Sequence, residues 1–352
     1  MQARSIPLDA LRGLAVLFML EVHLGFWWSR HLPGGDPLVA LGTSLGGMAA
    51  PLFFTVAGAG LSISRAQRPA GFRQANIRRG AALLAAGVVF TLIERAVYGP
   101  WGWGVLQSLG VSIIICTLAM VTGPAARAAG GFALMAVAPV LRHLAGIPDV
   151  LYSDSLMSVS SPAGYLDSAL LSGFFPLVPW TGFMLLGTVA GELSRADPTD
   201  SAGEAARAGK GPWHLAILAA FMLAFGGAGA AGGMPMEFFP PSLPFCLLAS
   251  GLCIAAIAAA GALTRTSRAP KRAGPLALAG RLSLTFFVVH HFIGYEAFSA
   301  AGLLRSLDTS VALAMVLASW ALAIAAAAAW SRTAFRFSLE WLLGRLCGRP
   351  SK

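Results

Sequence analysis

Ten long apolar stretches dominate this chain, and each is about the length that a helix needs to cross a membrane. A transmembrane helix takes roughly 20 apolar residues. The stretches are continuous, which excludes the ~10-residue alternating strands of a membrane barrel. We therefore expect an all-α, polytopic integral membrane bundle of about 10 transmembrane helices (10–11). The ten stretches are 7–28, 41–63, 80–98, 103–122, 125–142, 168–192, 213–233, 241–263, 275–297 and 309–331.

The composition excludes a soluble globular protein. Of the 352 residues, 57% are hydrophobic and only 11% are charged, whereas soluble domains carry about 25% charged residues. The 41 glycines and 21 prolines are spread among apolar runs, which argues against a collagen-like or disordered chain. No connection between the stretches is long enough to hold a soluble domain, so we expect residues 1–352 to form a single transmembrane domain.

Basic residues are distributed unevenly over the connections and predict the orientation of the bundle. With a cytoplasmic N-terminus, nineteen of the 25 Lys and Arg residues fall on the cytoplasmic side and four on the other. Cytoplasmic loops are enriched in Lys and Arg, so we expect both termini to be cytoplasmic and the protein to lie in the cytoplasmic (inner) membrane. The net charge of +10 then serves orientation and contact with membrane lipids, not nucleic acid. Residues 334–348 are typical of an amphipathic interfacial helix.

Two further patterns exclude other classes. The first apolar stretch contains Arg12, Glu21 and His23 and lacks a small-x-small cleavage site, so we interpret it as a retained span and not a signal peptide. The four cysteines show no CxxC or Cys/His ligand spacing, and neither HxxxH nor HExxH occurs. We therefore expect no disulfide framework and no metal.

Ionisable residues inside a span are costly and are commonly functional. Arg12 and His23 are eleven residues apart, so on an ideal helix they share one face, with ~16 Å between them along the axis. This spacing combines an anion-binding group near the cytoplasmic interface with a titratable base in the outer half of the membrane. The alternative is structural, with Arg12 reaching inner-leaflet phosphates and His23 satisfied within the bundle.

The ninth stretch repeats this combination with a different spacing. Arg281 lies near its cytoplasmic end, and His290 and His291 lie at about the depth of His23. Nine residues separate Arg281 from His290, which places them on opposite helix faces unless the helix is kinked. The two histidines are adjacent, so we expect only one of them to point into the bundle.

Several other polar groups gather toward the predicted outer side. His31 follows the first stretch, Glu94 ends the third, Gln107 begins the fourth and Glu296 ends the ninth. The sixth stretch contains two prolines, Pro176 and Pro179, which predict a break in the helix and free backbone groups beside a cavity.

Five ordered segments resemble membrane acyltransferases. Leu8–His23 (LDALRGLAVLFMLEVH) has the Arg-x10-His spacing of the acyltransferase-3 family. The other segments are similar to bacterial relatives of heparan-α-glucosaminide N-acetyltransferase, and together the matches extend over nearly the whole chain. These segments are Pro51–Ser64 (PLFFTVAGAGLSIS), Trp103–Ser112 (WGVLQSLGVS), Phe174–Gly191 (FFPLVPWTGFMLLGTVAG) and Gly280–His291 (GRLSLTFFVVHH).

The resemblance implies a cytoplasmic acyl-CoA donor, acetyl-CoA or a longer one, and a glycan or glycolipid acceptor whose hydroxyl or amine is acylated on the outer side. His23 would be the base or a transient acyl carrier. In the human-type enzymes the position matching His23 is asparagine and a later histidine is favoured, for which His31 is the approximate counterpart. His290 matches the histidine of the late span. Donor phosphates would be held by Arg12, Arg78, Arg79, Arg281 and Arg272 (or its neighbour Lys271), and the acceptor by Gln107, Glu94 and Glu296.

Two other functions compete with acyl transfer. One is a proton-coupled transporter that uses the Arg, His and Glu groups within the membrane, and the other is a membrane subunit without catalytic activity. A transporter binds its substrate near the midplane at interrupted helices, whereas an acyltransferase needs phosphate-binding arginines inside and a base outside. The choice of base, direct transfer or an acyl-histidine, the acyl length, the acceptor and the oligomeric state, a homodimer included, stay open at this stage.

Overall fold

The fold was determined as a computed structural model that describes residues 5–30, 42, 44–94, 99–147, 159, 161–194, 211–263 and 269–347, without the side chains of 211–212, 263 and 269–273. The regular elements among the described residues are all helices, apart from one isolated bridge between Ser29 and Leu307. Seven helices are long and apolar enough to span a membrane, or nine if two bent pairs each count as one span. The all-α, multi-pass prediction is thus confirmed for this part of the chain, although the predicted ten spans are not all reproduced.

The chain divides into two compact units, Met1–Phe53 with Ala260–Lys352 (unit 1) and Phe54–Ala259 (unit 2). The helices of unit 1 are α1 (Ile6–Trp28), α13 (Ala269–Gly280), α14 (Ser283–His291), the π-helical η3 (Phe292–Ala297), α15 (Phe298–Ala300), α16 (Thr309–Ser331) and α17 (Leu339–Leu346). The helices that begin or lie in unit 2 are α4 (Phe72–Ile93), α6 (Val105–Ala119), α7 (Pro124–Leu144), α8 (Pro162–Asp167), η2 (Ser168–Ser172), α9 (Leu177–Leu193) and α11 (Gly211–Ala231). Two helices cross the division, α3 (Ala49–Gln67) and α12 (Leu243–Leu263).

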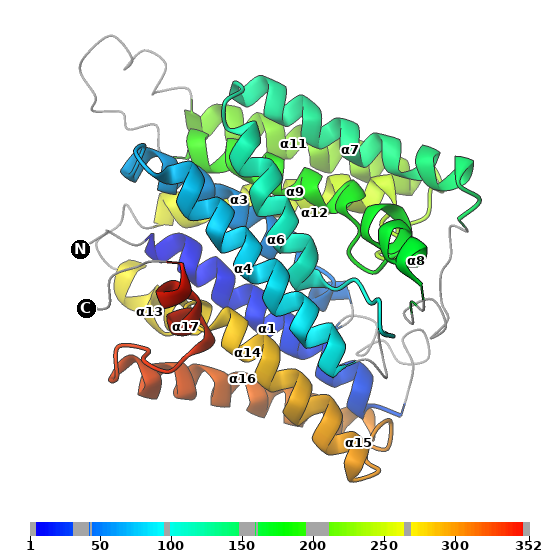
Figure 1. Ribbon diagram of the computed structural model, residues 1–352, viewed down its shortest axis with the longest axis vertical. Helices are drawn as coiled ribbons and strands as arrows, with labels where there is room; N and C mark the ends of the chain where they lie inside the picture. Colours follow the sequence, from blue (N-terminus) through cyan, green and yellow to red (C-terminus); the bar gives the residue numbers. More distant parts are fainter. Residues whose placement is uncertain are drawn as a thin grey trace. The chain divides into compact units, whose positions relative to one another are not determined.

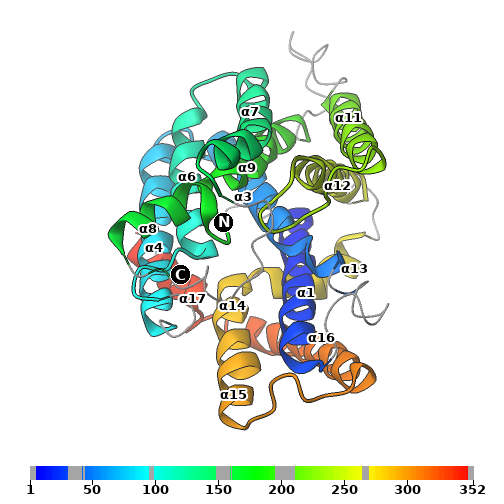
Figure 2. The ribbon, with the colours of Figure 1, turned by 90° about the vertical axis from the view of Figure 1, so that its right-hand side faces the viewer.

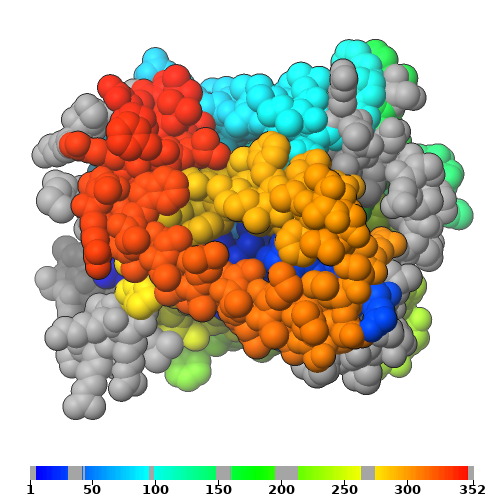
Figure 3. All heavy atoms as spheres, turned by 90° about the horizontal axis from the view of Figure 1, so that it is seen from below, coloured from blue at the N-terminus to red at the C-terminus, as the bar shows by residue number. Residues whose placement is uncertain are grey.

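In unit 1, α1 is the central helix and packs against α13, α14 and α16 (Figures 1 and 2). Pro7 lies in its first turn, where a missing N–H costs nothing. Side chains such as Val16, Leu20 and Leu24 are buried against Leu282 and Phe286, and their van der Waals packing helps to hold these helices together. In the view from below, part of α1 is visible in blue between α14 and α16 (Figure 3).

The C-terminal segment of unit 1 folds back onto the start of α14. The Glu340 carboxylate of α17 accepts hydrogen bonds from the backbone N–H of Leu284 at 2.6 Å, the N–H of Thr285 at 3.0 Å and the Thr285 hydroxyl at 2.6 Å. A carboxylate at a helix N-terminus satisfies orphan N–H groups and complements the helix dipole. The structure thus contains a helix within the predicted amphipathic segment 334–348, and its placement at a membrane interface stays a prediction.

In unit 2, α9 is the most buried helix and packs against α6, α7 and α11. Its glycines allow backbones to meet: a Cβ added to Gly187 would lie 2.1 Å from the carbonyl oxygen of Thr55 on α3. Such close crossings are typical of membrane helices with small residues. Arg127 of α7 is 2% exposed and pairs with Glu192 of α9, so a charge that the sequence assigned to orientation also joins two helices.

The fourth and fifth predicted spans differ from the expectation in length, and the sixth and ninth are broken. The fifth forms the 21-residue helix α7, whereas the fourth forms only the 15-residue α6. The sixth is broken as its prolines predicted: Pro162–Ser172 and Leu177–Leu193 meet at 46°. The ninth is also broken, with Gly274–Gly280 and Ser283–Ala300 meeting at 67°.

Candidate active site

Two histidines from opposite ends of the sequence meet in unit 1. Nδ1 of His23 on α1 lies 2.9 Å from Nε2 of His290 on α14. The other ring nitrogen of His290, Nδ1, lies 3.1 Å from the carbonyl oxygen of Phe286, one turn earlier on the same helix. The two imidazole planes are only 16° apart, with centroids separated by 5.0 Å, so the rings lie edge to edge.

Trp27 lies against both imidazoles. The plane of its indole makes an angle of 12° with the His23 ring, and the two ring centroids are 5.2 Å apart. With the His290 ring the angle is 14° and the centroid distance 5.6 Å. His23 and Trp27 are four residues apart on α1, so their side chains project from the same helix face. His291 meets the edge of the same indole at 5.5 Å. The histidine pair is therefore held in a fixed plane by aromatic packing.

The end of α1 that carries these side chains is anchored from two directions. The indole N–H of Trp28 donates to the carbonyl oxygen of Gly294 at 2.9 Å, which ties α1 to η3. The backbone N–H groups of Arg305 and Leu307 donate to the last carbonyls of α1, those of Trp27 and Trp28. Helix C-termini leave four carbonyls without intrahelical partners, and these bonds satisfy two of them.

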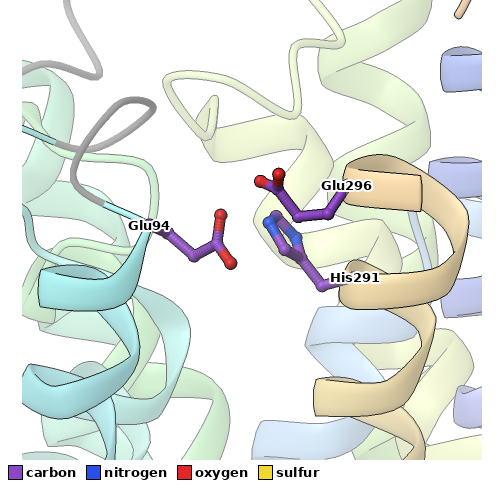
Figure 4. A group of neighbouring side chains, drawn as sticks. All are labelled: Glu94, His291 and Glu296. Atoms are coloured by element: carbon purple, nitrogen blue, oxygen red, sulfur yellow. The ribbon is translucent and has the colours of Figure 1, made fainter. Parts of the chain in front are cut away.

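Irregular helix geometry shapes the α14 side of the site. After His291 the helix continues as the π-helical η3, and single π-helical turns are frequent at functional sites. Its i→i+5 pattern brings His291 and Glu296 together, with ligating atoms within 4.8 Å of each other. Figure 4 shows both side chains on this segment and also labels Glu94, which belongs to unit 2. Both His290 and His291 are 6% exposed, so the expectation that only one would point inward is wrong.

The other end of α1 carries the first intramembrane arginine. Arg12 donates to the Asp9 carboxylate at 2.6 Å, and its side chain is 24% exposed. Arg281 lies in the break between α13 and α14, with its guanidinium 3.8 Å above the centroid of the Phe335 ring. The break supplies the kink without which Arg281 and His290 could not share a face. Each guanidinium thus has a partner that orients it, the Asp9 carboxylate for Arg12 and the Phe335 ring for Arg281.

Comparison with protein families now gives this arrangement a context. The family model described as heparan-alpha-glucosaminide N-acetyltransferase, catalytic, matches residues 4–225. The chain belongs to this family. A second model, protein of unknown function (DUF418), matches residues 203–348, and no curated protein matches the chain. Membership in the heparan-α-glucosaminide N-acetyltransferase family, together with the apolar helices, indicates a membrane-embedded acetyltransferase and does not favour a transporter.

The family match includes α1 with Arg12 and His23, whereas His290 lies in the part matched by the second model. The hydrogen-bonded histidine pair thus joins the two matched regions through the fold of unit 1. No sequence spacing could show this, since 267 residues separate the two histidines.

The remaining predicted site residues of this acetyltransferase family member lie in unit 2 or outside the description. Gln107 is 1% exposed, and its amide accepts from the Gly104 N–H and donates to the Gly102 carbonyl. Its internal hydrogen bonds give it a capping role at the start of α6.

Glu94 is 3% exposed at the end of α4. On the same helix, Arg78 is exposed and Arg79 half-buried. Two predicted site residues cannot be placed in this way. His31 lies outside the described residues, and for Arg272 the structure describes the backbone but not the side chain.

Sequence reasoning missed three contributors to the site. Two of them are tryptophans of α1: Trp28 is 4% exposed, and Trp27 packs on the histidines. The carbonyl of Phe286 carries no sequence signal, because any residue offers a backbone oxygen. A helical spacing signal did exist for Trp27, since it lies four residues after His23.

Proposed function

We propose that this protein transfers an acetyl group from acetyl-CoA to an amine or hydroxyl of a sugar, with His23 at the reacting centre. The observation that carries the proposal is the hydrogen-bonded pair of His23 and His290, held against Trp27 on a helix whose other end bears Arg12. The family description names an amino-sugar acetyltransferase. An amine of a glucosaminide is therefore the acceptor to test first.

At the reacting centre, an imidazole serves as the base. General base catalysis by a positioned imidazole contributes typically ~10²–10⁴-fold in rate. The acceptor nitrogen or oxygen attacks the thioester carbonyl carbon while the imidazole takes its proton. An alternative route forms an acyl-imidazole first and passes the acyl group to the acceptor in a second step. Hydroxylamine trapping of an acylated histidine distinguishes the two routes.

At the donor end, we expect Arg12 and Arg281 to bind the phosphates of acetyl-CoA from the cytoplasmic side. Arginine forks match phosphate oxygens in geometry and charge. Asp9 orients the Arg12 guanidinium through one nitrogen and leaves others for a ligand. Arg78, Arg79 and Arg272 remain candidates for the same role, and a longer acyl chain is a variant of the same proposal.

The acceptor side is the less defined half of the proposal. Glu94, Gln107 and Glu296 are the proposed acceptor contacts, with a glycan or glycolipid as the acceptor. Exposed Glu296 is the candidate that needs the least rearrangement to meet a ligand. We place the protein in the cytoplasmic membrane with both termini inside, an orientation that rests on the distribution of basic residues.

The test is acetyl transfer by the purified protein in lipid nanodiscs, with labelled acetyl-CoA and an α-glucosaminide. We expect labelled product and thermal stabilisation by acetyl-CoA. Absence of transfer to amine and hydroxyl acceptors, combined with proton-coupled uptake in vesicles, would instead support the transporter.

Two variants separate donor binding from chemistry. His23→Ala should abolish transfer and retain stabilisation by acetyl-CoA, because the imidazole acts on the reacting atoms and not on the phosphates. Arg12→Ala should mainly raise KM for acetyl-CoA. Arg336→Gln removes an exposed positive charge from the C-terminal segment and serves as the control that should leave both quantities unchanged.

A further inference from the structure

The hydrogen bonds around His290 restrict where its proton lies. A carbonyl oxygen can only accept, so the contact of 3.1 Å between Nδ1 of His290 and the Phe286 oxygen requires a proton on Nδ1. A neutral imidazole with its proton on Nδ1 has its lone pair on Nε2. That nitrogen lies 2.9 Å from Nδ1 of His23, which must then carry the proton between the two rings.

We infer that His290 is a positioning residue that holds His23 in the tautomer with the proton on Nδ1 and the lone pair on Nε2. The Phe286 carbonyl, His290 and His23 thereby form a directed chain of two hydrogen bonds. The second nitrogen of a histidine is commonly fixed in this way by the bond that the first one makes. This inference rests on the proposed function and decides which of the two histidines is the base.

Accessibility agrees with this assignment of roles. Both ring nitrogens of His290 are engaged, and the residue is 6% exposed. His23 is half-buried, and its Nε2 has no hydrogen-bond partner among the described residues. A base must reach the proton that it abstracts. Of this pair, His23 is the histidine that offers a lone pair without first breaking a hydrogen bond between described residues.

Trp27 stabilises the plane in which this chain operates. The indole is nearly parallel to both imidazoles, so rotation of either ring about its Cβ–Cγ bond would lose stacking contact. Rotation would also misalign the N–H of His23 with the lone pair of His290, and hydrogen bonds weaken steeply with angle. Trp27 is therefore part of the same positioning device.

The chemical step follows from this arrangement. Nε2 of His23 takes the proton of the acceptor N–H or O–H as that atom forms a bond to the thioester carbonyl carbon. The carbon–sulfur bond then breaks with its electron pair on sulfur, and the proton on Nε2 passes to this thiolate to give free CoA. His290 neither gains nor loses a proton; it stabilises the imidazolium of His23 by accepting from Nδ1.

The activity test uses variants that separate positioning from proton transfer. His290→Gln keeps an amide oxygen to accept from His23 and an amide N–H to donate to Phe286, whereas His290→Phe keeps neither. We expect His290→Gln to retain kcat within ~10-fold, His290→Phe to lose ~10²-fold, and His23→Gln to lose ~10³-fold or more. KM for acetyl-CoA should stay unchanged in all three. Equal loss in both His290 variants with activity retained in His23→Gln would make His290 the base and overturn the inference, as would two fully active His290 variants.

A second measurement is independent of activity. Diethylpyrocarbonate acylates the lone pair of a neutral imidazole, and the modified residues are identified by mass spectrometry. We expect His23 to react before His290 in the wild-type protein, and His290 to become reactive in His23→Phe. His143 and His214 are exposed and serve as internal references. Reaction of His290 before His23 would overturn the inference even if no acetyl transfer were found, whereas absent transfer with the expected labelling would count against the proposed function alone.

Discussion

Gly280 packs so closely on Asp9 that a β-carbon added to Gly280 would lie 1.9 Å from the Asp9 carbonyl oxygen. The contact is reciprocal within the same crossing, because a β-carbon on Gly13 would lie 2.0 Å from the carbonyl oxygen of Leu276. The backbones of α1 and α13 therefore touch at Gly13 and Gly280, the immediate chain neighbours of Arg12 and Arg281. Small residues that let helices approach in this way are a common means of membrane helix packing.

Replacement of Gly280 by alanine should separate these helices. No rotamer change can relieve a clash between a β-carbon and a backbone oxygen, and overpacking costs typically 1–3 kcal/mol or more. We expect Gly280→Ala to lower the thermal unfolding temperature in detergent and to weaken acetyl-CoA binding. Gly274→Ala is the matched control on the same helix, since its β-carbon would meet nothing within 4 Å. Equal stability of the two variants would contradict the close crossing.

The Glu340 carboxylate should stabilise the start of α14. It accepts hydrogen bonds from two backbone N–H groups and one hydroxyl there. A hydrogen bond to a charged group contributes about 1.5–3 kcal/mol to stability. We expect Glu340→Ala to reduce the free energy of unfolding by about 2 kcal/mol, as loss of a strong helix cap does. Glu340→Gln, which retains an accepting oxygen, should lose less. Exposed Arg336 in the same segment provides the control Arg336→Gln, and an effect of similar size there would refute the capping role.

The sequence predicted the helices well because hydrophobic length is a property of each segment alone. The break of the sixth stretch was visible for the same reason, because Pro176 and Pro179 act locally. The break of the ninth was not predicted: the sequence said only that Arg281 and His290 need a kink to share a face, and the structure has one of 67°. Arg12 and His23 were proposed as site residues because ionisable side chains within an apolar run are rare.

Contacts between distant segments could not be predicted in this way. The hydrogen bond from His23 to His290 depends on how α1 meets α14. The close approach of Gly13 and Gly280 sets how α1 meets α13, the helix before α14. The buried position of Arg127 escaped notice because its location near a helix start resembles an ordinary cytoplasmic charge. The length of α6 was overestimated, since apolar residues continue past the point where its hydrogen bonding ends at Ala119.

The ion pair of Arg127 and Glu192 gives an asymmetric prediction. The Arg127 side chain is 1% exposed and that of Glu192 is 36% exposed. Glu192→Ala leaves a buried guanidinium without its counter-charge, which costs about 3–5 kcal/mol when a buried pair is broken. Arg127→Met leaves a carboxylate that water can still reach, so we expect a smaller loss of unfolding free energy. The double variant should be more stable than Glu192→Ala alone. Thermal unfolding of the three variants measures the order, and the reverse order would contradict the burial of Arg127.

The hydrogen bond from Trp28 to Gly294 should affect catalysis more than stability. Trp28→Phe keeps an aromatic ring in the core, but it replaces the indole by a smaller phenyl ring and removes the N–H that donates to the Gly294 carbonyl at 2.9 Å. An unsatisfied buried carbonyl costs about 1–3 kcal/mol, and the freed η3 segment directly follows His290 and His291 on the chain. We expect kcat for acetyl transfer to fall while KM for acetyl-CoA is unchanged, because the donor phosphates are proposed to bind at the other end of α1. Trp320→Phe is the control in the same unit, since Nε1 of Trp320 has no hydrogen-bond partner among the described residues. A fall in kcat of equal size in both variants would show that ring size, and not the bond to Gly294, is what matters.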